Sequence, residues 1–356
     1  MILLIPAVFF CFIALVNVFF WPSVRRRETY APVSILIPAR NEEANLPECL
    51  TAAITSDALE IIVYNDHSTD ATARIVSTYA KRDPRVRLLD PSELPLGWAG
   101  KTFACHCLSL AAKGDYLLFL DADVRITSDA PSRIAAEAAA RNVSLLSCWP
   151  GFEMRSFWER ALMPLLNFVV FSIYPSPLSF FLPHASLGLA HGACILARRD
   201  VYQRLGGHVL VRNEMFEDTR LAQVWRQLGE RSLCLDGADL VTVRMYQNFS
   251  EIWRGFQKNF YPAFRHKRNY WTFLTLHFTV FLLPFLLLPF DLDFWPAAAA
   301  ILAIRLVLAL RFRHPVWSVL LQPFTEALLI ALGLISFWRV VKGHGVTWKG
   351  RAYRTI

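Results

Sequence analysis

The chain has 356 residues, of which 54% are hydrophobic, and a formal net charge of +8. This length leaves room for one large domain or two modest ones. The basic residues gather beside long apolar segments, so the excess charge points to anionic lipid. We therefore exclude a nucleic-acid-binding protein and expect no nucleic-acid partner.

The first 22 residues carry no charged side chain, which is enough apolar length to cross a bilayer. Arg25, Arg26 and Arg27 follow at once. A cleavable signal peptide has its positive charge before the apolar run, and here the order is reversed. We predict an uncleaved transmembrane anchor over 1–22, with its amino end outside and the following chain in the cytoplasm.

Short apolar segments alternate with amphipathic ones from residue 32 onward. Strands are predicted over 33–37, 60–64, 86–89 and 116–120, and helices over 43–56, 69–80, 100–112 and 131–141, with Ser68 or Thr69 as the cap of the second helix. This alternation predicts an α/β fold with a mostly parallel sheet and helices on both faces. In such folds ligands bind beyond the carboxyl ends of the strands.

Three of these predicted strands end on polar, acidic residues. They are followed by Pro38-Ala39-Arg40-Asn41-Glu42, by Asn65-Asp66-His67-Ser68 and by Asp121-Ala122-Asp123. Side chains alternate along an extended segment, so Asp121 and Asp123 can point the same way. Two carboxylates at a buried strand end need a neutralising partner, and a divalent cation carrying phosphates provides one. Three polar, acidic strand ends in one sheet favour a nucleotide-diphosphate site. The chain has no GxGxxG or Walker motif, so neither a dinucleotide enzyme nor a P-loop is supported.

The seven cysteines are scattered without a CxxC pair, which fits apolar fillers in a reducing cytosol. Cys105-His106-Cys107 looks like a metal-binding cluster, but it lies in the helix predicted over 100–112. Successive positions of a helix diverge, so we expect no zinc there.

Residues 161–183 form an uncharged apolar stretch in the middle of the chain. A single crossing there would put Asp121 and Asp218 on opposite sides of the membrane. Four prolines also argue against a regular span, namely Pro164, Pro175, Pro177 and Pro183. We predict a membrane-dipping or core segment.

The carboxyl third is basic at first and then apolar. Its basic residues are Arg254, Lys258, Arg265, Lys267 and Arg268, and its apolar segments are 271–290, 294–310 and 315–338. Positive flanks on both sides predict a cytoplasmic domain over 30–268 and a transmembrane region over 271–338. The basic tail 339–356 also favours the cytoplasm, so one segment should fail to cross. The candidates are 294–310, with Arg305, and the helix interrupted by Gln322, Pro323 and Glu326.

The ordered set of Pro38 to Glu42, Asn65 to Asp70, Asp121 to Asp123 and Glu217-Asp218 resembles the family 2 glycosyltransferases with a GT-A fold. The resemblance covers about residues 32–260. The Gln-x-x-Arg-Trp motif of many processive members is missing, so the chain looks more like members that glycosylate carotenoids, hopanoids or ceramide. The resemblance implies an inverting transfer from a nucleotide sugar, here expected to be UDP-linked, to a membrane lipid.

The resemblance also implies roles for individual residues. Donor-binding residues would be Pro38, Arg40, Glu42, Asp66, Lys101 and Asp121, with Glu42 and Asp66 at the nucleoside and Asp66 facing the base. Asp121 and Asp123 would hold Mg²⁺ or Mn²⁺ and the diphosphate, with Asp123 the nearer ligand. Asp218, the second acid of its pair with Glu217, would remove the acceptor proton.

Three assignments have a structural alternative that stays open. Glu217 and Asp218 are either catalytic or only first-turn acids favoured by the helix dipole. Arg254 and Lys258, one helical turn apart, either cap the donor diphosphate or contact lipid headgroups. His191, together with Gly192, either lines the acceptor pocket or is a buried structural histidine.

We therefore expect a multi-pass glycosyltransferase of the cytoplasmic membrane whose catalytic domain faces the cytoplasm. A polyprenyl-phosphate sugar transferase is the alternative within the same class, and its phosphate acceptor would not need a base. A catalytically inactive scaffold of an envelope-lipid pathway is the alternative from a different class.

Overall fold

The computed structural model of the protein describes residues 3–26, 31–342, 346–348 and 351–353. The chain divides into two compact units. The sheet unit comprises residues 22–153 and 179–245, and the helical unit comprises residues 1–21, 154–178 and 246–356. Arg27 of the predicted arginine triplet, and parts of the predicted tail 339–356, lie outside the described residues.

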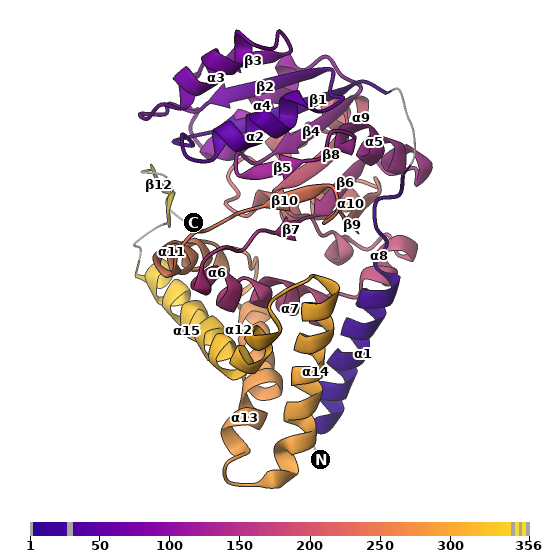
Figure 1. Ribbon diagram of the computed structural model, residues 1–356, viewed down its shortest axis with the longest axis vertical. Helices are drawn as coiled ribbons and strands as arrows, with labels where there is room; N and C mark the ends of the chain where they lie inside the picture. Colours follow the sequence, from indigo (N-terminus) through magenta and orange to yellow (C-terminus); the bar gives the residue numbers. More distant parts are fainter. Residues whose placement is uncertain (1–2, 27–30, 343–345, 349–350, 354–356) are drawn as a thin grey trace. The chain divides into compact units, whose positions relative to one another are not determined.

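A seven-stranded sheet forms the centre of the sheet unit, in the order β3-β2-β1-β4-β8-β6-β9 (Figure 1). The strands are β1 (Val33–Ala39), β2 (Glu60–Asn65), β3 (Val86–Leu89), β4 (Tyr116–Leu120), β6 (Leu145–Trp149), β8 (Cys194–Arg198) and β9 (Ser232–Asp236). Strand β8 runs antiparallel to β4 and β6, and the other neighbours pair in parallel. The predicted mostly parallel α/β sheet is therefore confirmed, and the four predicted strands correspond to β1, β2, β3 and β4.

Helices cover both faces of this sheet. They are α2 (Leu46–Ile54), α3 (Thr72–Ala80), α4 (Gly100–Ala111), α5 (Ala130–Ala140), α9 (Arg199–Leu205) and α10 (Glu217–Gln227). Because side chains alternate along a strand, β1 contributes to two cores. Ile35 packs in one core with Leu46 of α2, and Leu36 packs in the other with Trp225 of α10.

The expected cap of the second helix is wrong. Helix α3 begins at Thr72 rather than near residue 69. Asp70 accepts hydrogen bonds from the backbone N–H and the hydroxyl of Thr72, at 3.0 and 2.6 Å. Ser68 is used elsewhere, because its hydroxyl accepts the backbone N–H of Asn41 at 3.0 Å. The hydroxyl of Ser68, which could have capped a helix, therefore joins the loop after β2 to the loop after β1.

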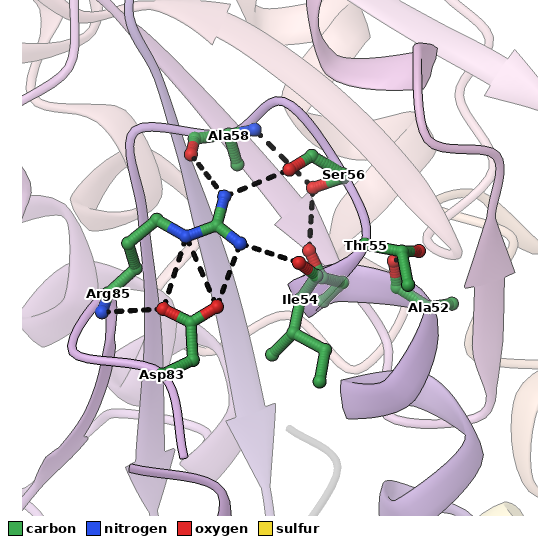
Figure 2. A network of polar contacts seen from close by, with 8 residues as sticks. Ala52, Ile54, Thr55, Ser56, Ala58, Asp83 and Arg85 are labelled. Carbon is green, nitrogen blue, oxygen red and sulfur yellow. Dashed lines mark hydrogen bonds and ion pairs between the residues drawn. The ribbon is translucent and has the colours of Figure 1, made fainter. Parts of the chain in front are cut away.

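The guanidinium of Arg85 ties the α2–β2 turn to the start of β3 (Figure 2). It donates to the carbonyl oxygens of Ile54, Ser56 and Ala58 at 2.5, 2.9 and 3.0 Å. Asp83 forms an ion pair with it at 2.8 Å. These contacts satisfy the last carbonyl group of α2 and two carbonyl groups of the turn after it, which would otherwise need water.

We expect Arg85→Met to loosen this turn without changing the sheet. The loss of charge-assisted hydrogen bonds to backbone carbonyls should cost about 2 kcal/mol. Hydrogen exchange of the amides in 54–61 should then speed up about thirtyfold, if local opening controls it. Arg74→Met, at an exposed position on α3, is the matched control, and equal exchange in both variants would contradict the role of Arg85.

A second, three-stranded sheet of order β5-β10-β7 lies in the same unit. It consists of β5 (Val124–Ile126), β7 (Gly151–Phe152) and β10 (Val241–Val243). Strand β5 starts directly after Asp123 and pairs antiparallel with β10. The backbone N–H of Arg244 also donates to the carbonyl of Asp123 at 3.4 Å. The Asp-x-Asp segment is therefore fixed between β4 and β5.

The helical unit is built from helices, most of them apolar. They are α1 (Leu4–Phe20), α6 (Phe157–Leu162), α7 (Pro164–Ile173), α11 (Phe249–Phe260), α12 (Lys267–Leu276), α13 (Leu283–Leu287), α14 (Trp295–Arg311) and α15 (Gln322–Val341). Three helical segments are long and apolar enough to cross a membrane: Lys267–Leu287, Leu292–Arg311 and Val316–Val341. Helix α1 is apolar but has 17 residues. The number of crossings and the side of the tail stay predictions.

The apolar stretch 161–183 is interrupted rather than continuous. It comprises the end of α6, then α7, then α8 (Ser176–Phe181). Asn17 of α1 is fully buried, and its side-chain amide donates to the carbonyls of Phe171 and Tyr174 at 2.7 and 2.6 Å. Its carbonyl oxygen accepts the backbone N–H of Ser176 at 3.1 Å. The break between α7 and α8 is thus satisfied by one side chain of α1.

Candidate functional site

The loops that follow β1 and β2 are joined by side-chain-to-backbone hydrogen bonds. The N–H of Glu42 donates to Thr72 at 2.9 Å, and that of Glu43 donates to Asp70 at 3.0 Å. Arg40 donates to the carbonyl of Asp66 at 2.7 Å. Because Ala39 pairs with Asn65 in the sheet, these bonds fix the two loops as one edge.

This edge carries four of the predicted donor-binding residues. Pro38 is half-buried within β1, Arg40 and Glu42 lie just beyond it, and Asp66 is buried after β2. The structure therefore places four predicted donor-binding residues at one edge, including Glu42 and Asp66, which sequence reasoning assigned to the nucleoside. Arg40 also has a structural role, since its guanidinium holds the β2 loop.

Lys101 connects two acidic motifs that are far apart in the sequence. It lies in the first turn of α4, and its ammonium group is 2.7 Å from Asp121 Oδ1 and 2.9 Å from Glu217 Oε1. Burial alone would lower the pKa of Lys101, but the two carboxylates outweigh it and raise that pKa well above the usual value. Lys101 is therefore a fixed positive charge between the end of β4 and the start of α10.

Asp121 and Asp123 form a cluster of repelling carboxylates. Burial, followed by the negative charges of Asp121 and Glu42, raises the pKa of Asp123 to about 7. A carboxyl group in this position is stabilised as an anion when a cation binds beside it. Carboxylate oxygens are also the ligands that Mg²⁺ and Mn²⁺ prefer. The pair therefore fits the predicted metal.

The protein alone does not enclose such an ion. Among the residues that the structure describes, no group of three or more His, Cys, Asp or Glu side chains is arranged around one point as a metal site. Mg²⁺ commonly binds through one or two carboxylates and takes its other oxygens from substrate phosphates and water. An ion at Asp121 and Asp123 would accordingly need the donor diphosphate to complete its ligands.

Glu217 and Asp218 open helix α10 but differ in protonation. Burial would raise the pKa of Glu217, yet the ion pair with Lys101 outweighs it and lowers that pKa. Burial, followed by the negative charge of Glu217, raises the pKa of Asp218 to about 7. Adjacent carboxyl groups whose pKa values are pushed apart are typical of acid–base sites.

Asp218 is held by a contact across the fold. Its Oδ2 accepts the backbone N–H of Gly192 at 2.8 Å, and its Oδ1 accepts the N–H of Thr219 at 2.6 Å. A first-turn acid favoured only by the helix dipole needs no such distant partner. The tertiary contact therefore fixes the orientation of the Asp218 carboxyl group, and its catalytic role stays a prediction.

Gly192 lies where the acidic motifs meet. A Cβ atom at this position would be 3.2 Å from both Asp218 Oδ2 and Lys101 Nζ, and 3.6 Å from Asp121 Oδ2. Sequence reasoning placed Gly192 with His191 as a candidate lining of the acceptor pocket and did not assign its N–H a function. The contact of this N–H with Asp218 could not be found from the sequence, since the two residues lie 26 positions apart.

We expect Gly192→Ala to impair the site without unfolding the protein. The added methyl group would crowd Asp218 and Lys101 by a few tenths of an ångström. A displacement of positioned groups by this amount should reduce kcat about tenfold or more. The readout is the turnover rate together with the melting temperature. Unchanged turnover would show that Asp218 and Lys101 need not be held in this geometry.

His191 lies in an aromatic environment beside this site. Its ring is 5.1 Å from that of Trp149 and 6.0 Å from that of Phe152. Burial, with a contribution from the charge of Lys101, lowers its pKa to about 3. Its Nδ1 accepts the N–H of Ala193 at 3.2 Å. The ring is therefore neutral, and its Nδ1 is engaged by the backbone of its own turn. This favours the structural alternative, and contact with an acceptor stays a prediction.

The two remaining predicted residues belong to the helical unit. Arg254 and Lys258 lie one turn apart on α11, and Arg254 donates to the carbonyl and hydroxyl of Ser250 at 3.2 and 2.9 Å. Their contact with the donor stays a prediction, as does the lipid-headgroup alternative.

The mostly parallel sheet with acidic residues at its carboxyl edge defines an α/β domain of the GT-A type. Residues 34–206 match the family described as Glycosyl transferase family 2. A mannosyltransferase from Pyrobaculum calidifontis in complex with GDP-Man and Mn2+ has a similar fold, with a TM-score of 0.54 at 19% identity over 94% of this chain and 99% of that chain. The family model thus matches just under half of this chain.

Curated relatives include proteins named 4,4'-diaponeurosporenoate glycosyltransferase. The one from Staphylococcus haemolyticus is 26% identical over 239 residues, which are 66% of this chain and 62% of the relative. The one from Staphylococcus aureus is 28% identical over 233 residues, which are 64% of this chain and 60% of the relative. These matches therefore span about three fifths of each relative.

Proposed function

We propose that this chain is an inverting glycosyltransferase that moves a sugar from a nucleotide-sugar donor to a lipid acceptor. The observation that carries the proposal is the juxtaposition around Gly192 of Asp121, Lys101 and Asp218, with Glu217 paired to Lys101. This arrangement places Asp121, on the donor side, near Asp218, whose pKa is raised to about 7. A glycosyl transfer to a hydroxyl needs a group that holds the leaving diphosphate and a base that faces the acceptor, on opposite sides of the anomeric carbon.

The donor would lie along the carboxyl edge of the sheet. Glu42 and Asp66 would contact the nucleoside, and Asp121 and Asp123 would hold Mg²⁺ or Mn²⁺ with the diphosphate. When bound, the ion would stabilise the negative charge that develops on the leaving diphosphate. The Mn2+ and GDP-Man in the Pyrobaculum calidifontis structure support this placement by fold alone. We propose a UDP-linked donor.

Asp218 would act as the base on the acceptor side. The acceptor oxygen forms a bond to the anomeric carbon while the bond from that carbon to the diphosphate oxygen breaks. The hydroxyl proton passes to Asp218 Oδ1 or Oδ2, and the diphosphate leaves with the electron pair. Lys101 and Glu217 would position this carboxyl group against the donor side. One displacement with one base inverts the anomeric configuration.

A carboxylate acceptor is a second candidate, and the names of the relatives favour it, since the ending of diaponeurosporenoate denotes a carboxylate. Such an acceptor is already an anion and would not need Asp218 to remove a proton. A polyprenyl phosphate would behave in the same way. An inactive scaffold would transfer no sugar at all.

A donor and acceptor screen tests the proposal directly. Purified full-length protein is incubated with native lipid extract and with a panel of UDP- and GDP-linked sugars, and the lipids are analysed by mass spectrometry. We expect one lipid class to gain a hexose mass from a UDP-sugar. A gain only on carboxylic lipids supports the second candidate, and the absence of any product with every donor contradicts the proposed activity.

The proposed location is the cytoplasmic membrane, with the sheet unit in the cytoplasm where sugar nucleotides occur. We expect a Lys81→Cys variant to resist a membrane-impermeant maleimide in intact cells and to react after permeabilisation. Lys81 is exposed, whereas nearby Asp83 forms an ion pair with Arg85 that a cysteine would remove. The unsubstituted protein, whose cysteines are buried or half-buried, is the control. Ready labelling of intact cells would overturn this orientation.

A further inference from the structure

Five polar side chains gather among the three apolar segments of the helical unit. His277 begins a π-helical turn (His277–Leu282), Arg305 lies on α14, Ser318 lies on a 3-10 turn (Val316–Leu321), and Gln322 and Glu326 lie on the first turns of α15. Each is at most 2% exposed. We refer to these five residues as the polar cluster. Ionisable residues inside such segments are costly and usually functional.

Direct contacts join the members of the polar cluster. Glu326 pairs with Nδ1 of His277 through one oxygen and accepts Nε2 of Gln322 at 3.1 Å through the other. Arg305 donates to the carbonyl of Ser318 at 3.4 Å and is within electrostatic range of Glu326. The guanidinium of Arg305 and the carboxylate of Glu326 therefore balance each other when His277 is neutral.

Four atoms of the polar cluster lack a hydrogen-bond partner. Within the described part of the chain, eight buried side-chain nitrogen or oxygen atoms are unpartnered, and four belong to this cluster: His277 Nε2, Arg305 Nε, Ser318 Oγ and Gln322 Oε1. An unbonded polar atom is especially costly among apolar helices. Half of all such atoms belong to residues that contact one another, which points to a ligand rather than to scattered imperfections in packing.

The chemistry of the four atoms selects the ligand. Arg305 Nε can only donate, Gln322 Oε1 can only accept, and Ser318 Oγ can do both. His277 Nε2 accepts when the ring proton on Nδ1 faces Glu326. A carboxylate or phosphate only accepts, and it would also meet the negative charge of Glu326. A hydroxyl group donates and accepts and carries no charge.

We propose that the polar cluster binds a neutral hydroxyl group, supplied by a membrane-embedded lipid alcohol or by water. The hydroxyl oxygen would accept from Arg305 and Ser318, and its proton would be donated to His277 or Gln322. The π-helical turn that starts at His277 supports this inference, because such turns are frequent at functional sites. The proposal concerns the helical unit alone and does not depend on the transfer reaction.

Photolabelling tests the lipid source. Full-length protein in lipid nanodiscs is irradiated with a diazirine analogue of hexadecanol, and labelled peptides are identified by mass spectrometry. We expect saturable labelling of peptides from 277–282 and 316–326, competed by hexadecanol but not by hexadecane or palmitate. The double variant Ser318→Ala with Gln322→Met should reduce labelling about tenfold, the effect of about one lost hydrogen bond. Ser172→Ala is the control, since that buried hydroxyl already donates to Phe168 at 2.6 Å.

The remaining outcomes are equally decisive. If labelling is not saturable, a cryo-electron microscopy map of the same nanodiscs should show ordered water bonded to at least three of the four atoms, which assigns the hydroxyl to water. Labelling without site selectivity together with no bound density would overturn the proposal, as would stronger competition by palmitate than by hexadecanol. Melting temperatures are measured for each variant, and Ser318→Ala alone replaces the double variant if the latter unfolds.

Discussion

Asp218→Asn is expected to lower kcat by roughly two to four decades, the usual contribution of a positioned base. The change is nearly isosteric, and the amide oxygen can still accept the N–H of Gly192, so the fold and the affinity for the donor should be preserved. The measurement is single-turnover transfer to the lipid identified by the screen, with donor binding followed separately. A loss of less than threefold on a hydroxyl acceptor would show that another group removes the proton.

The pH profile identifies the base independently. The pKa of Asp218 is raised to about 7, and only its carboxylate form can accept a proton. The value of kcat/KM should therefore rise with pH through about 7 and level off above it. Glu217→Gln removes a negative charge that raises this pKa, so it should move the rise to lower pH and reduce kcat less than Asp218→Asn does. A rise unchanged in Glu217→Gln would contradict the assignment to Asp218.

Asp123→Ala should abolish transfer while the protein remains folded. Asp123 lies between β4 and β5, and its carboxylate is destabilised by burial and by the negative charges of Asp121 and Glu42 until a cation binds. Chelation by EDTA should have the same effect on the unsubstituted enzyme, and Mn²⁺ or Mg²⁺ should restore its activity but not that of the variant.

Asp90→Ala is the control for this change, because Asp90 is an exposed carboxylate just beyond β3 on the same sheet. It should retain activity and the same requirement for metal. Full activity of the unsubstituted enzyme in EDTA would remove the metal from the proposed mechanism and leave Lys101 as the cation nearest to the diphosphate.

The sheet could be predicted from the sequence because its strands are apolar runs with sharp polar ends. Strands β3 and β4 have the predicted bounds, and β1 and β2 extend one or two residues further. The cap of α3 could not be predicted, because Ser68 satisfies the backbone of Asn41, which is 27 positions away. Local propensity does not include such a partner.

The candidate site was likewise only partly predictable from the sequence. The acidic residues were found from their order along the chain, which needs no structure. The pairing of Lys101 with both Asp121 and Glu217, and the different pKa values of Glu217 and Asp218, depend on how α4 and α10 are placed on the sheet. The lowered pKa of His191 likewise follows from its burial and from the charge of Lys101, which no motif connects to it.

The hydrogen bonds of Asn17 can form only late in the synthesis of the chain. Its partners Phe171, Tyr174 and Ser176 lie more than 150 residues later in the chain. At ribosomal rates of about 5–20 residues per second, α1 exists for on the order of ten seconds or more before they emerge. During that interval the amide of Asn17 must be satisfied by water, lipid headgroups or a chaperone. The nascent first helix is therefore at its most vulnerable to misassembly before α7 is made, and slowing translation between them would lengthen that exposure.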